Sequence, residues 1–297
     1  MTIKFLTLNL LQGGLLMDNI LNFLDQQQPD IIALQEVHNG TNPNLPANYR
    51  SIQILSQHLS RYKSFFKAGF LRQAPEGNID QGNAIFSKFP IKQKEAYFVN
   101  GEYDLQPNIP PNRDWSTNPQ IMQWAEIEVG DNNLNIFNLH GIWGKDGDDN
   151  PARHRMGQII LDQIKGKSNV ILAGDFNLRP TTQVIKNIEQ HLTNVFKDEL
   201  VTTFNLQRKG PSADSGYATS VVDMIFVSPN LKIISHSCPQ VDISDHLPLV
   251  IELGIDNVVS SASQDQALLD QAEQDIQNHQ YSEINTRKEL LKHLHDL

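Results

Sequence analysis

Short apolar runs recur through the first 250 residues, and each is bounded by polar residues, Gly or Pro. Runs of this length rich in Ile, Leu and Val are typical of buried β-strands. A further run alternates apolar and polar positions, which predicts a half-buried strand at residues 124–129. The buried strands are predicted at residues 3–8, 31–34, 134–139, 170–173 and 224–227.

Apolar residues at helical spacing predict three helices between these strands. They cover residues 15–27, 154–164 and 181–191, and Pro180 precedes the last, where its missing N–H does little harm. Strands with interspersed helices favour a mixed β-sheet architecture with helices packed outside. Segments 39–48, 69–81 and 101–119 are rich in Pro, Asn and Gly and are predicted to be long loops of the kind that shape binding sites.

The composition changes near residue 254. We expect a main domain at 1–254, a linker rich in Ser, Asp and Gln at 255–266, and a tail of short amphipathic helices at 267–297. Thr286 and Glu289 form a capping-box pattern ahead of apolar residues on one helix face. The tail has three open roles: packing on the main domain, self-association and binding of a partner.

Charge and composition limit the classes of function. The chain has 39% hydrophobic and 20% charged residues and a net charge of −10, so it lacks the broad basic surface of a tight, non-specific nucleic-acid binder. Cys238 is the only cysteine, so no intrachain disulfide can form. No apolar run approaches the roughly 20 residues of a membrane span, and no secretory signal is recognisable. We therefore expect a cytoplasmic protein.

Several predicted strands end in acidic, amide or histidine residues. Buried strands need no carboxylates at their ends, so this placement indicates side chains that converge on one edge of the fold. Converging carboxylates repel one another unless a cation or a proton lies between them. Oxygen ligands without a closely spaced His/Cys set favour Mg²⁺, or Mn²⁺, over zinc. The strand-end residues are Asn9, Glu36, His140, Asp175, Asn177, Asp245 and His246.

Over residues 1–253 the chain resembles the endonuclease/exonuclease/phosphatase superfamily, also called the DNase I-like fold. Each motif is weak alone, but together they follow the family's order. The motifs are Thr7-Leu8-Asn9, Leu34-Gln35-Glu36-Val37, Gly82-Asn83 through Pro90, Asn138-Leu139-His140, Gly174-Asp175-Phe176-Asn177, Val222-Asp223-Met224-Ile225-Phe226 and Ser244-Asp245-His246-Leu247-Pro248.

The resemblance implies a four-layer α/β sandwich of two packed mixed β-sheets flanked by helices. It also implies a role for each matching residue. Glu36, Asn9 and Asp245 would bind the metal, Asp175 and Asn177 would orient the attacking water, and His140 would contact the scissile phosphate. His246 would be the catalytic histidine paired with Asp223. Asn83 and Arg155 would bind substrate, with Arg155 more a support of the site than a direct contact. Apart from the resemblance, Arg113 stands with Tyr103 and Trp115 in the predicted loop 101–119, and an Arg beside aromatic residues suits the binding of a base or a phosphate of the substrate.

The implied activity is Mg²⁺-dependent hydrolysis of phosphodiester bonds, foremost those of nucleic acids or nucleotides. Two alternatives remain open. One is a phosphatase or phosphodiesterase that acts on lipid head groups, phosphoinositides or other small phosphoesters. The other is a non-catalytic module that binds a partner through the tail, although a complete set of site residues argues against it. The identity of the general base, Asp175 or His246, also stays open.

Overall fold

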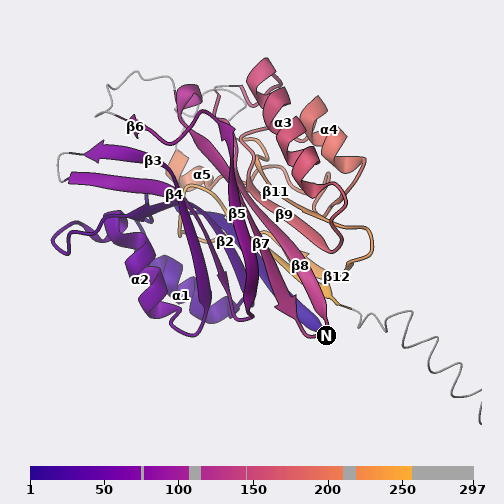
Figure 1. The fold of residues 1–297 in the computed structure, drawn as a ribbon, viewed down its shortest axis with the longest axis horizontal. Coiled ribbons are helices and arrows are strands. Elements are labelled where there is room, and N and C mark those ends of the chain that lie inside the picture. Colours follow the sequence, from indigo (N-terminus) through magenta and orange to yellow (C-terminus); the bar gives the residue numbers. More distant parts are fainter. Residues whose placement is uncertain (75–76, 107–114, 145, 210–218, 256–297) are drawn as a thin grey trace, which may run out of the picture. The chain divides into compact units, whose positions relative to one another are not determined.

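Two β-sheets face each other in the computed structural model, which describes residues 1–74, 77–106, 115–144, 146–209 and 219–255. We name them sheet A and sheet B (Figure 1). Sheet A contains, in spatial order, β12 (Lys232–Ser237), β13 (Leu249–Gly254), β1 (Thr2–Asn9), β2 (Ile31–Asn39), β4 (Gly77–Ser87), β3 (Lys63–Ala74) and β6 (Leu105–Gln106). Sheet B contains β10 (Thr193–Asn194), β11 (Asp223–Val227), β9 (Val170–Asp175), β8 (Asn132–His140), β7 (Gln120–Val129) and β5 (Ile91–Asn100).

Helices cover the outer face of each sheet. Helices α1 (Met17–Gln27) and α2 (Ser51–His58) share a core with sheet A, and α3 (Pro151–Ile164) and α4 (Gln183–Glu189) share one with sheet B. The predicted four-layer sandwich of two mixed sheets flanked by helices is therefore confirmed. Three short helices complete the described secondary structure: η1 (Ala47–Arg50), η2 (Trp115–Thr117) and α5 (Leu206–Lys209).

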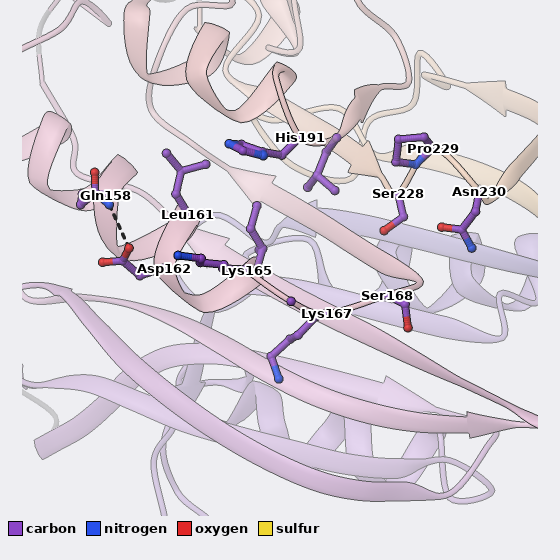
Figure 2. A pocket seen from close by; sticks show the side chains of 13 residues that line it. Gln158, Leu161, Asp162, Lys165, Lys167, Ser168, His191, Ser228, Pro229 and Asn230 are labelled. Carbon is purple, nitrogen blue, oxygen red and sulfur yellow. Dashed lines mark hydrogen bonds between the residues drawn. The ribbon is translucent and has the colours of Figure 1, made fainter.

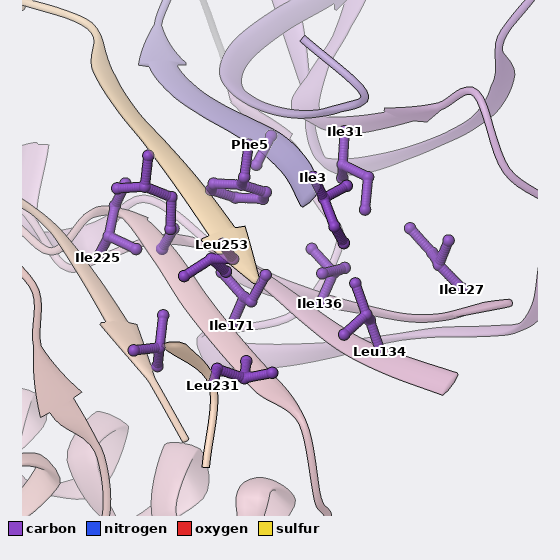
Figure 3. Packing of buried hydrophobic residues seen from close by; sticks show 14 of the residues in the cluster. Ile3, Phe5, Ile31, Ile127, Leu134, Ile136, Ile171, Ile225, Leu231 and Leu253 are labelled. Atoms are coloured by element: carbon purple, nitrogen blue, oxygen red, sulfur yellow. The ribbon is translucent and has the colours of Figure 1, made fainter. Parts of the chain in front are cut away.

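The alternation of side chains along each strand explains why the predicted strands are apolar throughout. In β1, Ile3 and Phe5 point into the layer between the sheets, whereas Leu6 and Leu8 pack against the α1–α2 side. Because helices cover the outer faces, both sides of the strand are buried. Figure 3 shows this inter-sheet layer, where Ile3, Phe5, Ile31 and Leu253 of sheet A meet Ile127, Leu134, Ile136, Ile171 and Ile225 of sheet B.

Local signals account for the helix that begins beside the candidate site. The Asn150 side chain accepts a hydrogen bond from the Arg153 N–H and caps α3, and Pro151 occupies the first turn. The predicted helix at 154–164 therefore starts three residues earlier, at Pro151. The other two start later than predicted: α1 begins at Met17 and α4 at Gln183.

One predicted loop is wrong. Residues 69–81 belong largely to a hairpin in which β3 pairs antiparallel with β4, in the register Arg72↔Ile79 and Gln73↔Asn78. The Gly and Asn residues that suggested a loop lie on paired strands, and a register shift between Ala68 and Phe70 accommodates Gly69.

The other long loop and the C-terminal segments are described only in part. Loop 101–119 contains β6 and η2, and its residues 107–114 lie outside the described part of the chain. The predicted tail, and the predicted linker apart from Ile255, also lie outside the described part of the chain. Among the described residues, no helix is both long and apolar enough to cross a membrane.

Candidate active site

The candidate site lies where the inter-sheet rows of side chains reach the ends of their strands. In β1 the row Ile3, Phe5 and Thr7 leads to Asn9 by steps of two residues. In β9 the row Ile171 and Ala173 leads to Asp175. Period-two alternation therefore directs both terminal side chains to one place at the edge of the apolar layer, and β11 adds Asp223, which pairs directly with Asp175.

Glu36 reaches the same place only because β2 is irregular. The register between β2 and β4 shifts between Leu34 and Val37, and Glu36 has a φ of 55°. Leu34 and Val37 both pack on the helix side of sheet A, so the chain contains one residue more than regular alternation allows. A non-glycine residue in this left-handed region costs about 1–2 kcal/mol. The bulge turns the Glu36 carboxylate toward the site.

Asn9 connects the two carboxylates. Its Nδ2 donates to Asp175 Oδ2 at 3.1 Å and to Glu36 Oε1 at 3.4 Å, and its Oδ1 accepts from the Leu11 N–H at 3.1 Å. The other Glu36 oxygen accepts from the Gln12 N–H at 2.6 Å. The turn after β1 therefore holds Glu36 through main-chain and amide donors, and Asn9 contributes its amide nitrogen to the cluster in this structure.

His246 and Asp223 form a buried pair on the other side of Asp175. His246 Nδ1 lies 2.8 Å from Asp223 Oδ2, and His246 Nε2 lies 3.9 Å from Asp175 Oδ2. Burial opposes the charged imidazole, but the carboxylates of Asp223, Asp175 and Asp245 outweigh it and raise the pKa of His246 to about 10. The Phe204 ring, 4.6 Å from the imidazole between ring centres, adds a hydrophobic contact that sequence reasoning missed.

His140 is the last residue of β8. Asn177 lies in the turn that follows β9, the adjacent parallel strand of sheet B. His140 Nε2 is 3.8 Å from Asp175 Oδ2, which makes Asp175 the common neighbour of Asn9, His140 and His246. Asn177 has a φ of 54°, its N–H donates to Asp175 Oδ1 at 2.9 Å, and its side chain donates to the Gly141 carbonyl at 3.1 Å. The Gly-Asp-Phe-Asn segment is therefore a strained turn tied to the loop after β8.

Asp245 is half-buried beside His246 in a loop fastened to β1. The neighbouring Ser244 hydroxyl donates to the Asn9 carbonyl at 2.7 Å, and the Asp245 carbonyl accepts from the Asn205 N–H at 2.8 Å. Asp245 therefore lies close enough to contribute to the field at His246. The structure brings together Asn9, Glu36, His140, Asp175, Asn177, Asp223, Asp245 and His246.

Two of the three residues assigned to substrate binding, Arg155 and Asn83, do not join this cluster. Arg155 is exposed on α3. Asn83 is buried and donates to the main-chain carbonyls of Ile121, at 3.2 Å, and Asn138, at 3.4 Å, so it supports the layer beneath the site. Arg113 lies outside the described residues.

The arginine that supports the site is Arg153, two positions earlier. Its side chain is fully buried. Its guanidinium donates to the carbonyls of Ile142, at 3.1 Å, and Asn177, at 2.9 Å, and to the carboxylate of Asp146, at 3.1 Å. Arg153 thus links the strained turn at Asn177 to the loop after β8. Sequence reasoning chose Arg155 by a family pattern, and only the phase of α3 in the fold distinguishes the two.

A buried amide network lies below the site. Asn138 Nδ2 donates to the carbonyls of Leu34 and Ala84 and to Gln123 Oε1 at 3.0–3.1 Å, and its Oδ1 accepts from Gln35 at 2.7 Å. These contacts join the two sheets where the inter-sheet layer changes from apolar to polar. The network fixes the relative positions of the strands that carry Glu36 and His140.

Among the cavities of the described residues, two lie at opposite ends of the strands. One, of about 240 Å³, borders the site and is lined in part by Glu36 and His140. The other, of about 540 Å³, lies beside the start of β9 and the end of β11, between Lys165, His191 and Asn230 (Figure 2). The larger cavity is therefore remote from the acidic cluster and takes no part in the candidate chemistry.

The sequence of this site matches a known family. A model of the endonuclease/exonuclease/phosphatase family matches residues 6–246. The chain belongs to the endonuclease/exonuclease/phosphatase family. The activities in the family's name all cleave phosphoester bonds, so membership indicates a phosphoesterase. No curated protein matches the chain in a direct sequence comparison.

Solved structures of the family share the fold at low identity. An endonuclease/exonuclease/phosphatase from Bacteroides vulgatus is 18% identical, with a TM-score of 0.64 over 86% of this chain and 100% of that one. A mannosyl-6-phosphatase from Bacteroides thetaiotaomicron is 19% identical, with a TM-score of 0.63 over 85% and 100%. D. rerio TDP2 complexed with a single-strand DNA product is 16% identical, with a TM-score of 0.61 over 86% and 99%. At these identities the likeness establishes the fold alone.

Proposed function

We propose that the protein hydrolyses phosphodiester bonds of nucleic acids or nucleotides with the help of a divalent cation, Mg²⁺ or Mn²⁺. The observation that carries the proposal is the position of Asp175. This buried carboxylate is within 4 Å of side-chain nitrogens of Asn9, His140 and His246, which belong to three different strands or loops. Phosphoester hydrolysis needs such a convergence, because a water molecule must be held in line with phosphorus.

The donor set fits a hard divalent cation. Glu36, Asp175, Asp223 and Asp245 are four carboxylates around one site, and no cysteine is present there. One ligand atom each of Asp175, Asp223 and His246 lie within 4.8 Å of one another. Because Asp223 and His246 are bonded to each other, we assign the metal to Glu36 and Asp245, with Asn9 beside them.

The bound metal would neutralise phosphate charge and lower the pKa of a water molecule. The chain's own residues would do the remaining work. Asn9 keeps Glu36 and Asp175 in place, and Asp175 with Asn177 holds the attacking water. The imidazole of His246, fixed by Asp223, donates a hydrogen bond to a phosphate oxygen and stabilises the charge that develops there. His140 faces the same oxygen atoms from β8.

A second candidate function is hydrolysis of small phosphoesters such as sugar or inositol phosphates. The cavity beside the site favours it, since a space of about 240 Å³ suits a single small group. A mannosyl-6-phosphatase has the same fold, which supports this second candidate. The intact acidic cluster argues against the non-catalytic alternative.

A panel of substrates tests both candidates. Purified protein is incubated with Mg²⁺ and plasmid DNA, an abasic oligonucleotide, bis-p-nitrophenyl phosphate, inositol phosphates or a hexose phosphate, beside the Asp175→Asn variant and EDTA controls. We expect Mg²⁺-dependent release from a nucleic-acid or diester substrate that the variant and EDTA abolish. Turnover of monoesters alone would favour the second candidate, and turnover that the variant retains would overturn the site assignment.

A further inference from the structure

The cavity that borders the acidic cluster is more than an extension of it. Glu36 and His140 form its inner side, so any group in the cavity is adjacent to the proposed phosphate position. At about 240 Å³ it is smaller than the roughly 300–1,000 Å³ of pockets for drug-sized ligands. It therefore suits one compact unit of a substrate and not a length of duplex.

The walls of the cavity combine aromatic rings with carboxamides. Of the three tryptophans in the chain, Trp115 and Trp143 line it, whereas Trp124 is buried in another core. Trp115 is 39% exposed and Trp143 is half-buried, so indole surface is open to a ligand there. An indole face that is open beside a polar site offers a flat apolar surface on which the ring of a ligand can stack.

The polar groups of the walls come from separate segments. Arg72 and Gln81 lie on the β3–β4 hairpin, and Asn118 and Gln120 lie at the start of β7. A carboxamide offers a donor and an acceptor side by side, which matches the edge of a nucleobase. The guanidinium of Arg72 provides a positive charge for a neighbouring phosphate. A lipid chain would remove water from the Arg72 guanidinium and from this polar lining, so the lining disfavours it.

We propose that this cavity is a subsite for one nucleobase next to the scissile phosphate. The proposal rests on the proposed function, which places the phosphate at Glu36 and His140. It narrows the substrate to nucleotides or single-stranded nucleic acid, because a base must be unpaired to enter. Trp115 and Trp143 would supply stacking surface, and Gln81, Asn118 and Gln120 would face the edge of the base.

Equilibrium binding tests the subsite without turnover. The full chain carrying Asp223→Asn, which lies outside the cavity lining, is titrated in Mg²⁺ by calorimetry with inorganic phosphate, adenosine 5′-monophosphate or glucose 6-phosphate. Each result is the ratio of two ligand affinities measured on the same variant. An effect of Asp223→Asn that is common to both ligands therefore cancels. We expect the nucleotide to bind at least about tenfold more tightly than phosphate, as stacking of one base would provide.

Two substitutions at Trp143 identify the source of this preference. Trp143→Ala should reduce the ratio of nucleotide to phosphate affinity to less than about threefold, and Trp143→Phe, which keeps a flat ring, should preserve most of it. If the alanine variant does not fold, Trp115→Ala, which removes the other stacking surface, takes its place and should reduce the same ratio. Equal affinities for nucleotide and phosphate, a ratio that survives Trp143→Ala, or an equal gain for glucose 6-phosphate would each overturn the proposal.

The test separates the subsite from the proposed function. Wild-type protein without phosphoester turnover, but with the nucleotide preference intact in the binding experiment, would overturn the proposed function and support the subsite. Wild-type protein with Mg²⁺-dependent turnover but no nucleotide preference would support the function and overturn the subsite.

Discussion

His246 Nδ1 lies 2.8 Å from Asp223 Oδ2, and both side chains are almost completely buried. A carboxylate in this position fixes the tautomer and the orientation of the imidazole, so Nε2 faces Asp175 at 3.9 Å. The two residues are 23 positions apart in the sequence, and the isolated β-bridge between Phe204 and His246 helps to hold the loop that brings them together.

Loss of the Asp223 carboxylate should impair catalysis while leaving substrate binding largely intact. Asp223→Asn keeps the shape of the side chain but removes the charge that orients His246, so we expect kcat to fall by about 10²–10⁴ with a small change in KM. Steady-state kinetics on the best substrate of the panel measures this. The exposed Asp198→Asn serves as the matched control, and a kcat within twofold of wild type for Asp223→Asn would refute the assigned pairing.

The two arginines near the start of α3 should differ sharply in their contribution to stability. Arg153→Met leaves the carbonyls of Ile142 and Asn177 without their buried donor, so we expect the free energy of unfolding to fall by about 2–4 kcal/mol. Arg155→Met on the exposed side of the helix should change it by less than about 0.5 kcal/mol. Urea unfolding measures both, and equal losses would contradict the support role of Arg153.

The amide network between the sheets should be essential to the packing beneath the site. Asn138→Leu has a similar volume but removes bonds to Gln35, Gln123 and two carbonyls, and we expect a loss of about 2–5 kcal/mol. Asn133→Leu, at an exposed position of the same strand, is the control. Thermal or urea unfolding decides the matter, and a loss below about 1 kcal/mol for Asn138→Leu would show that the network contributes little.

His38 should make stability depend on pH. Burial lowers the pKa of His38 from 6.5 to about 4 in the folded protein, so protonation favours the unfolded chain. The contribution of neutral His38 to the free energy of unfolding is complete above pH 6.5. It is lost as the pH falls toward 4, by about 3 kcal/mol in total. Urea unfolding at pH 7.5 and 4.5 should show a smaller decrease for His38→Gln than for wild type. The exposed His191→Gln should follow wild type, and identical decreases in all three proteins would exclude His38 as the cause.

The sequence predicted much of the site because regular strands carry positional information. Asn9 and Asp175 follow apolar rows by steps of two, so a buried strand that ends in a polar residue directs that side chain into the inter-sheet layer. The same reasoning works for His140 after Ile136 and Asn138. The family motifs then supply the role that the residue types alone leave open.

Irregular features escaped prediction for physical reasons. Glu36 was predicted as a site residue, but the bulge with a positive φ that brings it to the site was not, because a glutamate carries no local signal for that conformation. Arg153 lies on the side of α3 that faces the protein, and Arg155 lies on the exposed side. The exact start of the helix decides which of the two points inward. The hairpin of β3 and β4 is held by long cross-strand pairing, which overrides the loop tendency of its Gly and Asn residues.

A thermal-melting titration of wild type and Glu36→Gln with Mg²⁺ tests whether the acidic cluster binds a divalent cation. If the carboxylates form a divalent-cation site, Mg²⁺ should raise the Tm of wild type in a saturable manner, with about 2.7 kcal/mol of stabilisation at a hundred times Kd. Glu36→Gln should lose this shift yet melt at or above the wild-type temperature in EDTA, because one repulsive charge is gone. Equal Mg²⁺ shifts in both proteins, or none in wild type, would show that Glu36 is not part of a divalent-cation site.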